Sequence, residues 1–232
     1  MVLGGLQKNS LIDYPGKICS VLFLSGCNFD CPYCHNPSLV KGCPVKYPPV
    51  DAETVYKFLE SHKVFLDGVV ISGGEPTLQN DISDLCKNIK KMGYKVKLDT
   101  NGSRPQVIKR LVQEGFVDYI AMDIKTDPFK YAPITKEDRT PHRILSSIQV
   151  ILEARLPHEF KTTCVKPLVN ESVIETISHL IQGSDLYALQ RFRKTEVLHP
   201  EFFEENEYWI EESELLRMKS IAEPHVKRCI IR

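Results

Sequence analysis

Residues 18–36 read ICSVLFLSGCNFDCPYCHN, a short apolar run that leads directly into three closely spaced cysteines. The run Ile18–Leu24 has the length and composition of a buried strand. Cys27, Cys31 and Cys34 follow it with the spacing C-x3-C-x2-C. Three thiols on one loop can converge on a single metal centre. The stretch thus predicts a strand that ends in a metal-binding loop.

The same kind of apolar run recurs along the chain and alternates with segments of helical periodicity. We expect strands over residues 18–24, 68–72, 95–99, 118–123, 159–165 and 185–191. Strict alternation is typical of parallel strands joined by crossover helices. Six such units predict an α/β fold, either a partial barrel or an open doubly wound sheet. In both architectures the active site lies where the strands end, and polar side chains follow each run.

Capping residues and apolar side chains three and four positions apart mark the intervening helices. The clearest covers about residues 81–91, with Asn80 as its cap and Gly93 after its end. In a later helix we expect Val107 and Leu111 to face the core. That helix is expected to begin after Ser103, and further helices after Asp51, Thr140 and Asn170.

Length and charge restrict the possible classes of protein. At about 150 residues per domain, 232 residues make one large domain or two small ones. Lys plus Arg and Asp plus Glu both number 30, so the formal net charge is zero. A long-range basic field for duplex nucleic acid is therefore not expected. The run 18–24 is too short to span a bilayer and no cleavage site follows it. We expect a cytoplasmic protein with neither a membrane nor a nucleic-acid partner.

The chain has eight cysteines, of which three lie within eight residues and the rest are scattered. In a cytoplasmic protein such clustering indicates metal binding or catalysis rather than disulfides. Zinc sites and iron–sulfur clusters usually have four protein ligands, so three ligands leave a position for a substrate or cofactor. A zinc knuckle completed by His35 or by a distant Cys43 is the alternative. The others are expected to be small buried hydrophobes: Cys19, Cys86, Cys164 and Cys229.

C-x3-C-x2-C with an aromatic residue before the last cysteine is the signature of radical S-adenosylmethionine (SAM) enzymes, and the chain resembles them across most of its length. The resemblance implies a [4Fe–4S] cluster held by Cys27, Cys31 and Cys34. It also implies that the amino and carboxylate groups of SAM chelate the fourth iron. Of the two architectures, it favours a partial (β/α)6 TIM-like barrel with parallel strands.

A glycine pair and a glutamate follow the second predicted strand, at Gly73, Gly74 and Glu75. Glycines allow backbone to approach a ligand closely, and a carboxylate can pair with an ammonium group. Alone, these residues are a plain strand-to-helix turn. The resemblance to the superfamily implies that they hold the amino group of the cofactor's methionine part.

Two further motifs end the third and fourth predicted strands. Asp99, Thr100 and Asn101 form a turn sequence, and Asp123 and Lys125 share one face of a strand. Alone, Asp123 and Lys125 are a surface ion pair of little energetic weight. The resemblance implies that the turn contacts the methionine part and that Lys125 pairs with the cofactor carboxylate. It further implies that a monovalent cation is held by Asp99, Thr100 and Asp123.

Other candidates lie on the cysteine loop and on the last strands. The resemblance places Tyr33 near the adenine and Asn36 near the ribose. Arg191, after the sixth strand, either closes the adenosine side of the site or bridges to acidic residues. Lys161 and Thr163 point the same way on the fifth strand.

Residues 4–16 and 27–37 resemble the longer form of the anaerobic ribonucleoside-triphosphate reductase activating proteins. This resemblance implies that reductive cleavage of SAM gives a 5′-deoxyadenosyl radical. That radical removes hydrogen from a glycine Cα of a partner glycyl radical enzyme. It also implies a flavodoxin- or ferredoxin-type electron donor. Apart from the residues that bind the cluster and SAM, we assign no catalytic residue.

Two other functions stay open at this point. One is a radical SAM enzyme that acts on a small molecule or nucleotide, and the other is a non-enzymatic zinc-binding interaction module. We expect a single domain over residues 1–232, with the cluster loop at 26–36 and a C-terminal extension from about 200 to 232.

Overall fold

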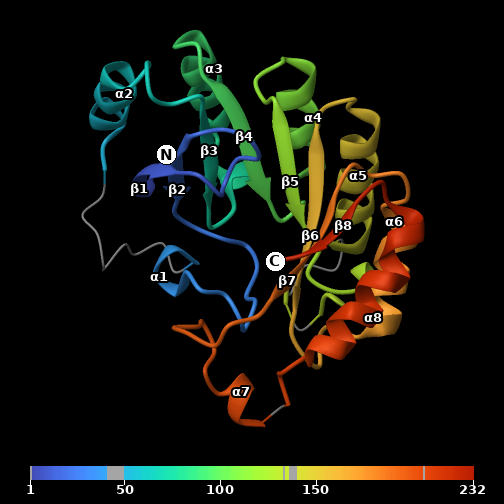
Figure 1. Cartoon of the computed structure of the whole chain (residues 1–232). Helices are drawn as coiled ribbons and strands as arrows, with labels where there is room; N and C mark the ends of the chain where they lie inside the picture. Colours follow the sequence, from blue (N-terminus) through green and yellow to red (C-terminus); the bar gives the residue numbers. More distant parts are fainter. Residues whose placement is uncertain (1, 41–49, 133, 136–139, 206) are drawn as a thin grey trace.

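A single sheet runs through the computed structural model, which describes residues 2–40, 50–132, 134–135, 140–205 and 207–232. Within these residues the order of the eight strands in the sheet is their order in the chain. β1 is antiparallel to β2, and all later neighbours are parallel (Figure 1). The strands are β1 (Leu3–Ser10), β2 (Cys19–Leu24), β3 (Gly68–Gly73), β4 (Lys95–Thr100), β5 (Tyr119–Asp123), β6 (His158–Cys164), β7 (Tyr187–Arg191) and β8 (Cys229–Ile231).

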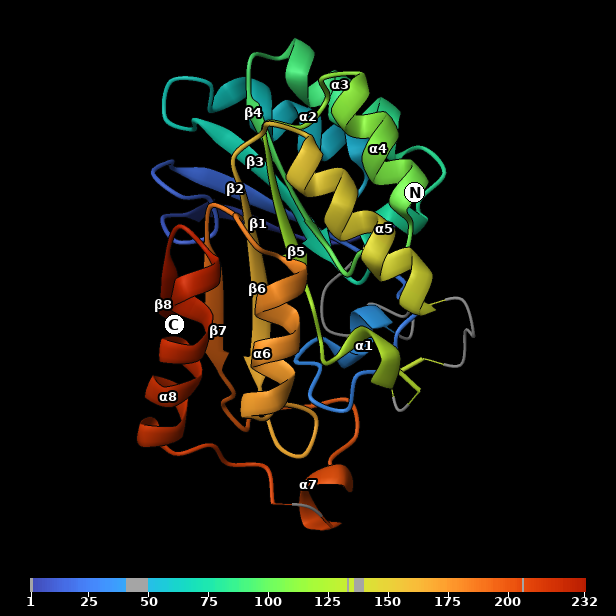
Figure 2. The same cartoon turned by 90° about the vertical axis from the view of Figure 1, so that its right-hand side faces the viewer.

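Helices α3, α4, α5, α6 and α8 lie side by side over one face of this sheet, as Figure 2 shows. The short helices α1 and α7 lie instead beyond the carboxyl ends of the strands (Figure 1). The helices are α1 (Pro37–Val40), α2 (Ala52–Ser61), α3 (Ile82–Lys91), α4 (Pro105–Gln113), α5 (Thr140–Glu153), α6 (Glu171–Leu180), α7 (Phe202–Glu205) and α8 (Glu212–Ala222). Single 3-10 turns cover Pro76–Leu78, Pro128–Lys130 and Glu223–His225.

The predicted parallel α/β architecture and its six strands, here β2 to β7, are confirmed. The prediction missed β1 and β8. β1 lacks regular alternation of buried and exposed residues and carries register shifts against β2, and β8 has three residues. The cap assigned to Asn80 was wrong, because the N-cap of α3 is Asp81. In α4, Ile108 and Leu111 are fully buried while Val107 is only partly buried.

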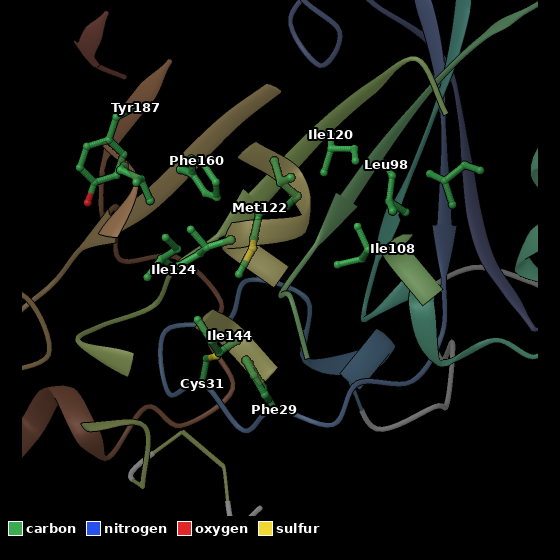
Figure 3. Packing of buried hydrophobic residues seen from close by; sticks show 14 of the residues in the cluster. Phe29, Cys31, Leu98, Ile108, Ile120, Met122, Ile124, Ile144, Phe160 and Tyr187 are labelled. Atoms are coloured by element: carbon green, nitrogen blue, oxygen red, sulfur yellow. The ribbon is translucent and has the colours of Figure 1, made fainter. Parts of the chain in front are cut away.

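The larger core lies between the sheet and its layer of helices. Alternate residues of each strand face it, as the two-residue period of a strand requires. Leu98, Ile120, Met122 and Phe160 are among its members, and Figure 3 shows their side chains stacked along neighbouring strands. The same packed cluster includes Phe29 of the cysteine loop. The loop is therefore anchored in the core rather than suspended in solvent.

The opposite face of the sheet carries a small apolar cluster next to charged side chains. Tyr14, Val70 and Tyr119 belong to a small second cluster on this face. The ammonium of Lys97 lies 5.8 Å from the centre of the Tyr119 ring, so the charged residues adjoin this cluster. The alternation that builds the core thus also places charged side chains on the free face.

Candidate metal and cofactor site

A cavity of about 220 Å³ lies where the carboxyl ends of β3 to β6 meet the cysteine loop. Most of the predicted site residues line it, together with several that were not predicted. The lining consists of Cys27, Phe29, Cys31, Tyr33, Cys34, His35, Asn36, Val40, Ser72, Gly73, Gly74, Asp99, Thr100, Asn101, Asp123, Lys125, Lys161 and Thr163.

Backbone hydrogen bonds fix the cysteine loop at its start and at Pro32 within it. The Gly26 N–H donates to the Leu39 carbonyl at 2.7 Å, and the His199 N–H donates to the Pro32 carbonyl at 3.1 Å. The His199 ring contacts the Asp30 carboxylate at 2.8 Å. The hydrogen bond between the ring and Asp30 raises the pKa of His199. The segment after β7 therefore holds the outer side of the loop.

All three loop thiols are free and face the one cavity. Burial raises the pKa of Cys31 to about 12 and that of Cys27 to about 11. The Lys125 ammonium opposes both shifts. Thiolates rather than thiols bind metal, so loading of these ligands releases protons. Three thiols and one ammonium group around the same cavity match the donor set of an iron–sulfur cluster with one open iron.

In the described part of the chain, no group of three or more His, Cys, Asp or Glu side chains could hold one metal ion. Cys19, Cys86, Cys164 and Cys229 are buried and free, as predicted. Cys43, considered as a distant zinc ligand, falls outside the described residues.

The glycine pair brings the backbone of β3 against the cysteine loop. The Gly74 N–H donates to Leu24 and the Glu75 N–H donates to Gly26, both at 2.8 Å. A Cβ on Gly74 would lie 2.1 Å from the Gly26 carbonyl oxygen. Gly73 has a φ of +115°, a conformation that side chains disfavour. Both positions require glycine because two backbones touch here.

Glu75 is fully buried and is not part of the cavity lining. Its Oε1 accepts hydrogen bonds from the Thr77 N–H at 3.0 Å, from the Thr77 hydroxyl, and from the Thr100 hydroxyl at 2.8 Å. Its Oε2 accepts one from the Asn101 N–H at 2.6 Å. Burial raises the pKa of Glu75, against the effect of these donors. The carboxylate ties two sequence motifs together behind the cavity wall.

Asn101 links the turn after β4 to the cysteine loop. Its amide nitrogen donates to Asn28 Oδ1 at 3.1 Å and lies 3.9 Å from the Cys27 sulfur. Its side-chain oxygen accepts from the Ser103 N–H at 2.9 Å. Hydrogen bonds to a ligating sulfur tune iron–sulfur clusters. Asn101 thus points a side-chain N–H group toward the Cys27 sulfur.

Lysines and aspartates alternate along the strands that border the cavity. Lys97 contacts Asp99 at 2.7 Å, and Lys125 contacts Asp123 at 3.2 Å. Lys161 contacts both carboxylates, at 3.7 and 3.3 Å. These lysines hold the pKa values of Asp99 and Asp123 below the ordinary value despite burial. The residues come from three neighbouring strands, so the sheet itself sets their spacing.

The remaining predicted contacts divide between the cavity and the protein exterior. Tyr33 and Asn36 line the cavity. The Tyr33 hydroxyl is buried without a hydrogen-bond partner in the described structure. Arg191 is absent from the cavity lining and forms an ion pair with Glu212. Of its two predicted roles, the geometry shows the bridge to an acidic residue.

From the sequence, no role was assigned to some of the residues that line the cavity. Lys161 and Thr163 had been placed on the correct face, but without an assigned role. The Ser72 hydroxyl donates to the Asp99 carboxylate at 3.2 Å. Ser72 precedes the Gly73–Glu75 motif, and no contact was predicted for it. The period-two pattern of the β6 sequence was the signal for Lys161. No signal marked Phe29, whose ring lies edge-on to Tyr131 at 5.7 Å between centroids.

Comparison with known proteins agrees with this geometry. A family model of the radical SAM superfamily matches residues 21–180. A Methanocaldococcus jannaschii protein assigned to the glycyl-radical enzyme activating enzymes is 35% identical over all of this chain and 95% of that protein.

Two further matches are more distant. The pyruvate formate-lyase-activating enzyme of Clostridium pasteurianum is 33% identical over 54% of each chain. The crystal structure of methylornithine synthase is similar in fold with a TM-score of 0.62, at 14% identity, over 91% of this chain and 63% of that one.

Proposed function

The chain belongs to the radical SAM superfamily, a family that uses a [4Fe–4S] cluster and SAM, and from this premise we propose that it activates a glycyl radical enzyme. The observation that carries the proposal is that one cavity gathers the three loop thiols, the Gly73–Gly74 backbone and the Lys125 ammonium. The extent of the match to an activating-enzyme relative supports the same class.

When bound, the cluster and SAM supply one electron and a cleavable S–C5′ bond, which together provide the radical chemistry. The protein's own contribution is binding and orientation. Cys27, Cys31 and Cys34 hold the cluster, and Lys125 pairs with the carboxylate of the cofactor. Gly73 and Gly74 bring backbone close to its amino group. Tyr33 covers the adenosine side with a buried ring.

For the partner we propose an anaerobic ribonucleoside-triphosphate reductase, and for the electron donor a flavodoxin or ferredoxin. The support is the resemblance of residues 4–16 and 27–37 to the activating proteins of that reductase. We place the reaction in the cytoplasm, because the described cysteines are all free and disulfides are rare in that compartment. In the described residues no helix is long and apolar enough to cross a membrane.

The first experiment tests the cluster and its open iron. The protein is reconstituted anaerobically with iron and sulfide, reduced, and followed by electron paramagnetic resonance with and without SAM. A [4Fe–4S]⁺ signal that changes on addition of SAM supports the proposal. Zinc without sulfide overturns it in favour of the interaction module, and a cluster signal that ignores SAM overturns it without supporting that module.

Matched cysteine variants show whether the loop thiols are responsible. Cys34→Ala is expected to lose the cluster signal, whereas Cys86→Ala, in the buried face of α3, is expected to keep it. Equal loss in both variants would mean that general instability, not ligation, explains the result.

A second experiment tests the partner. The loaded protein is mixed with SAM, reductant and either an anaerobic ribonucleotide reductase or a formate-lyase-type enzyme. A glycyl radical signal in the reductase alone supports the proposed partner. A signal only in the other enzyme refutes that partner but keeps the class. Cleavage of SAM with no radical in either protein favours a small-molecule substrate.

A further inference from the structure

One side chain on β6 bridges two carboxylates of neighbouring strands. The Lys161 ammonium lies 3.7 Å from Asp99 Oδ2 and 3.3 Å from Asp123 Oδ2. Asp123 and Lys161 are paired directly in the β5–β6 register. The side chain of Lys161 is only 12% exposed. Its position is therefore set by the sheet rather than by a flexible loop.

The other oxygens of these carboxylates already have cationic partners. Asp99 Oδ1 contacts Lys97 at 2.7 Å, and Asp123 Oδ1 contacts Lys125 at 3.2 Å. Around the two carboxylates there are thus three ammonium groups. A further cation between the Oδ2 atoms would face Lys161 at contact distance, and like charges at such distances repel strongly.

Thr100, the third residue expected to bind the cation, uses its hydroxyl group for hydrogen bonds within the protein. The Thr100 hydroxyl donates to Glu75 at 2.8 Å and accepts from the Gly102 N–H at 3.1 Å. Its proton and one lone pair are therefore used behind the cavity wall. The residues that the resemblance offers for a monovalent cation do not fit such an ion in this chain.

We propose that the Lys161 ammonium takes the place of a monovalent cation between Asp99 and Asp123, so that this chain binds SAM without a metal cation. An ammonium has one positive charge and donates hydrogen bonds to carboxylate oxygens. Lys161 is then a positioning residue that keeps Asp123, and through it Lys125, in place beside the cofactor. Burial opposes the charge of Lys161, but the carboxylates of Asp123 and Asp99 outweigh it and raise the pKa of Lys161 above its ordinary value. This role rests on the proposed binding of SAM at the cavity.

The first test uses the protein without cluster or SAM, so it does not depend on the proposed function. Binding of sodium is followed by ²³Na NMR line width, with tetramethylammonium as the inert replacement ion. We expect no specific broadening by the wild-type protein and saturable broadening by Lys161→Ala, which vacates the position between the carboxylates. Lys130→Ala removes a lysine that is 67% exposed and is expected to behave as wild type.

The second test measures SAM affinity of the cluster-loaded protein by equilibrium dialysis. In tetramethylammonium chloride we expect Lys161→Ala to bind SAM at least tenfold more weakly than wild type. Potassium or sodium at equal ionic strength should restore its affinity and leave wild type unchanged. Lys161→Arg, which keeps a cation in the position, should stay independent of added ions.

Two results would overturn the inference. One is specific sodium broadening, or a potassium-dependent SAM affinity, in the wild-type protein. The other is a Lys161→Ala variant that binds no ion and is not rescued by one. If that variant is too unstable for binding work, its thermal midpoint is measured instead, and a midpoint that fails to rise selectively with potassium counts against the inference. Loss of SAM binding by all proteins, with the sodium result intact, would refute the proposed function alone.

Discussion

Replacing Glu75 with glutamine separates a structural role for this carboxylate from a role as a cofactor ligand. The substitution keeps the shape and one acceptor oxygen but changes the other oxygen into an NH₂ donor. If the oxygen of the new amide faces Thr77 and Thr100, its NH₂ group faces the Asn101 N–H, which donates to Glu75 at 2.6 Å. The opposite orientation is worse because it opposes three donors instead of one.

The expected cost follows from the better of the two orientations. One hydrogen bond to a charged group, about 1.5–3 kcal/mol, is lost, and a buried N–H is left without its acceptor at about 1–3 kcal/mol. These two figures overlap, since both describe the same broken contact. We therefore expect a loss of about 2–4 kcal/mol in the free energy of unfolding.

The assay is urea unfolding of the iron-free protein under reducing conditions. Glu60→Gln is the matched control, because it makes the same chemical change in a side chain that is 63% exposed. Its surface ion pair should cost at most about 1 kcal/mol. Unchanged stability of Glu75→Gln, combined with weaker binding of SAM to the loaded protein, would refute the structural role and favour the direct contact with the cofactor's amino group.

Three further changes test other parts of the site. Gly74→Ala sets a methyl group against the Gly26 carbonyl, so iron and sulfide content after reconstitution should fall sharply, and full incorporation would contradict the close contact. Because Asp30 raises the pKa of His199, their pairing stabilises the protein at low pH and fades as the pH rises above the ordinary histidine value of about 6.5. Wild type should then lose up to about 1 kcal/mol between about pH 6 and 9 relative to His199→Asn, and parallel urea-unfolding profiles would exclude this. Lys125→Met should weaken SAM binding at least tenfold in equilibrium dialysis, with iron content unchanged, and an unaltered affinity would remove Lys125 from the cofactor site.

The sheet and the cavity were predictable because they depend on local patterns. Apolar runs followed by polar residues located β2 to β7. The parallel-sheet rule then gathered their ends, including Asp99 and Asp123, at one edge. The cysteine spacing alone placed three thiols on one loop. The strands β1 and β8 lacked such a pattern, because one is irregular and the other has three residues.

Pairings between distant residues were the part that sequence could not supply. Glu75 belongs to a recognisable motif, yet its partner Thr100 lies 25 residues away and directs the carboxylate away from the cavity. From its position in the sequence, Arg191 could equally well contact the cofactor or form an ion pair with an acidic residue. Its contact with Glu212 depends on how α8 packs, which no periodicity reveals. The bridging position of Lys161 likewise depends on the register of three strands.

The agreement between the order of the strands in space and their order in the chain has a consequence for biosynthesis. Each strand added at the ribosome pairs with the strand made just before it, so no later strand has to enter between two finished ones. Domains fold from the N-terminus during synthesis, and the cysteine loop emerges early, while the last lining residue, Thr163, belongs to β6. Arg232 then forms an ion pair with Glu159 of β6 at 2.6 Å. A nascent chain therefore presents its thiols well before β6 has been made, and metal loading at that stage would meet an unfinished site.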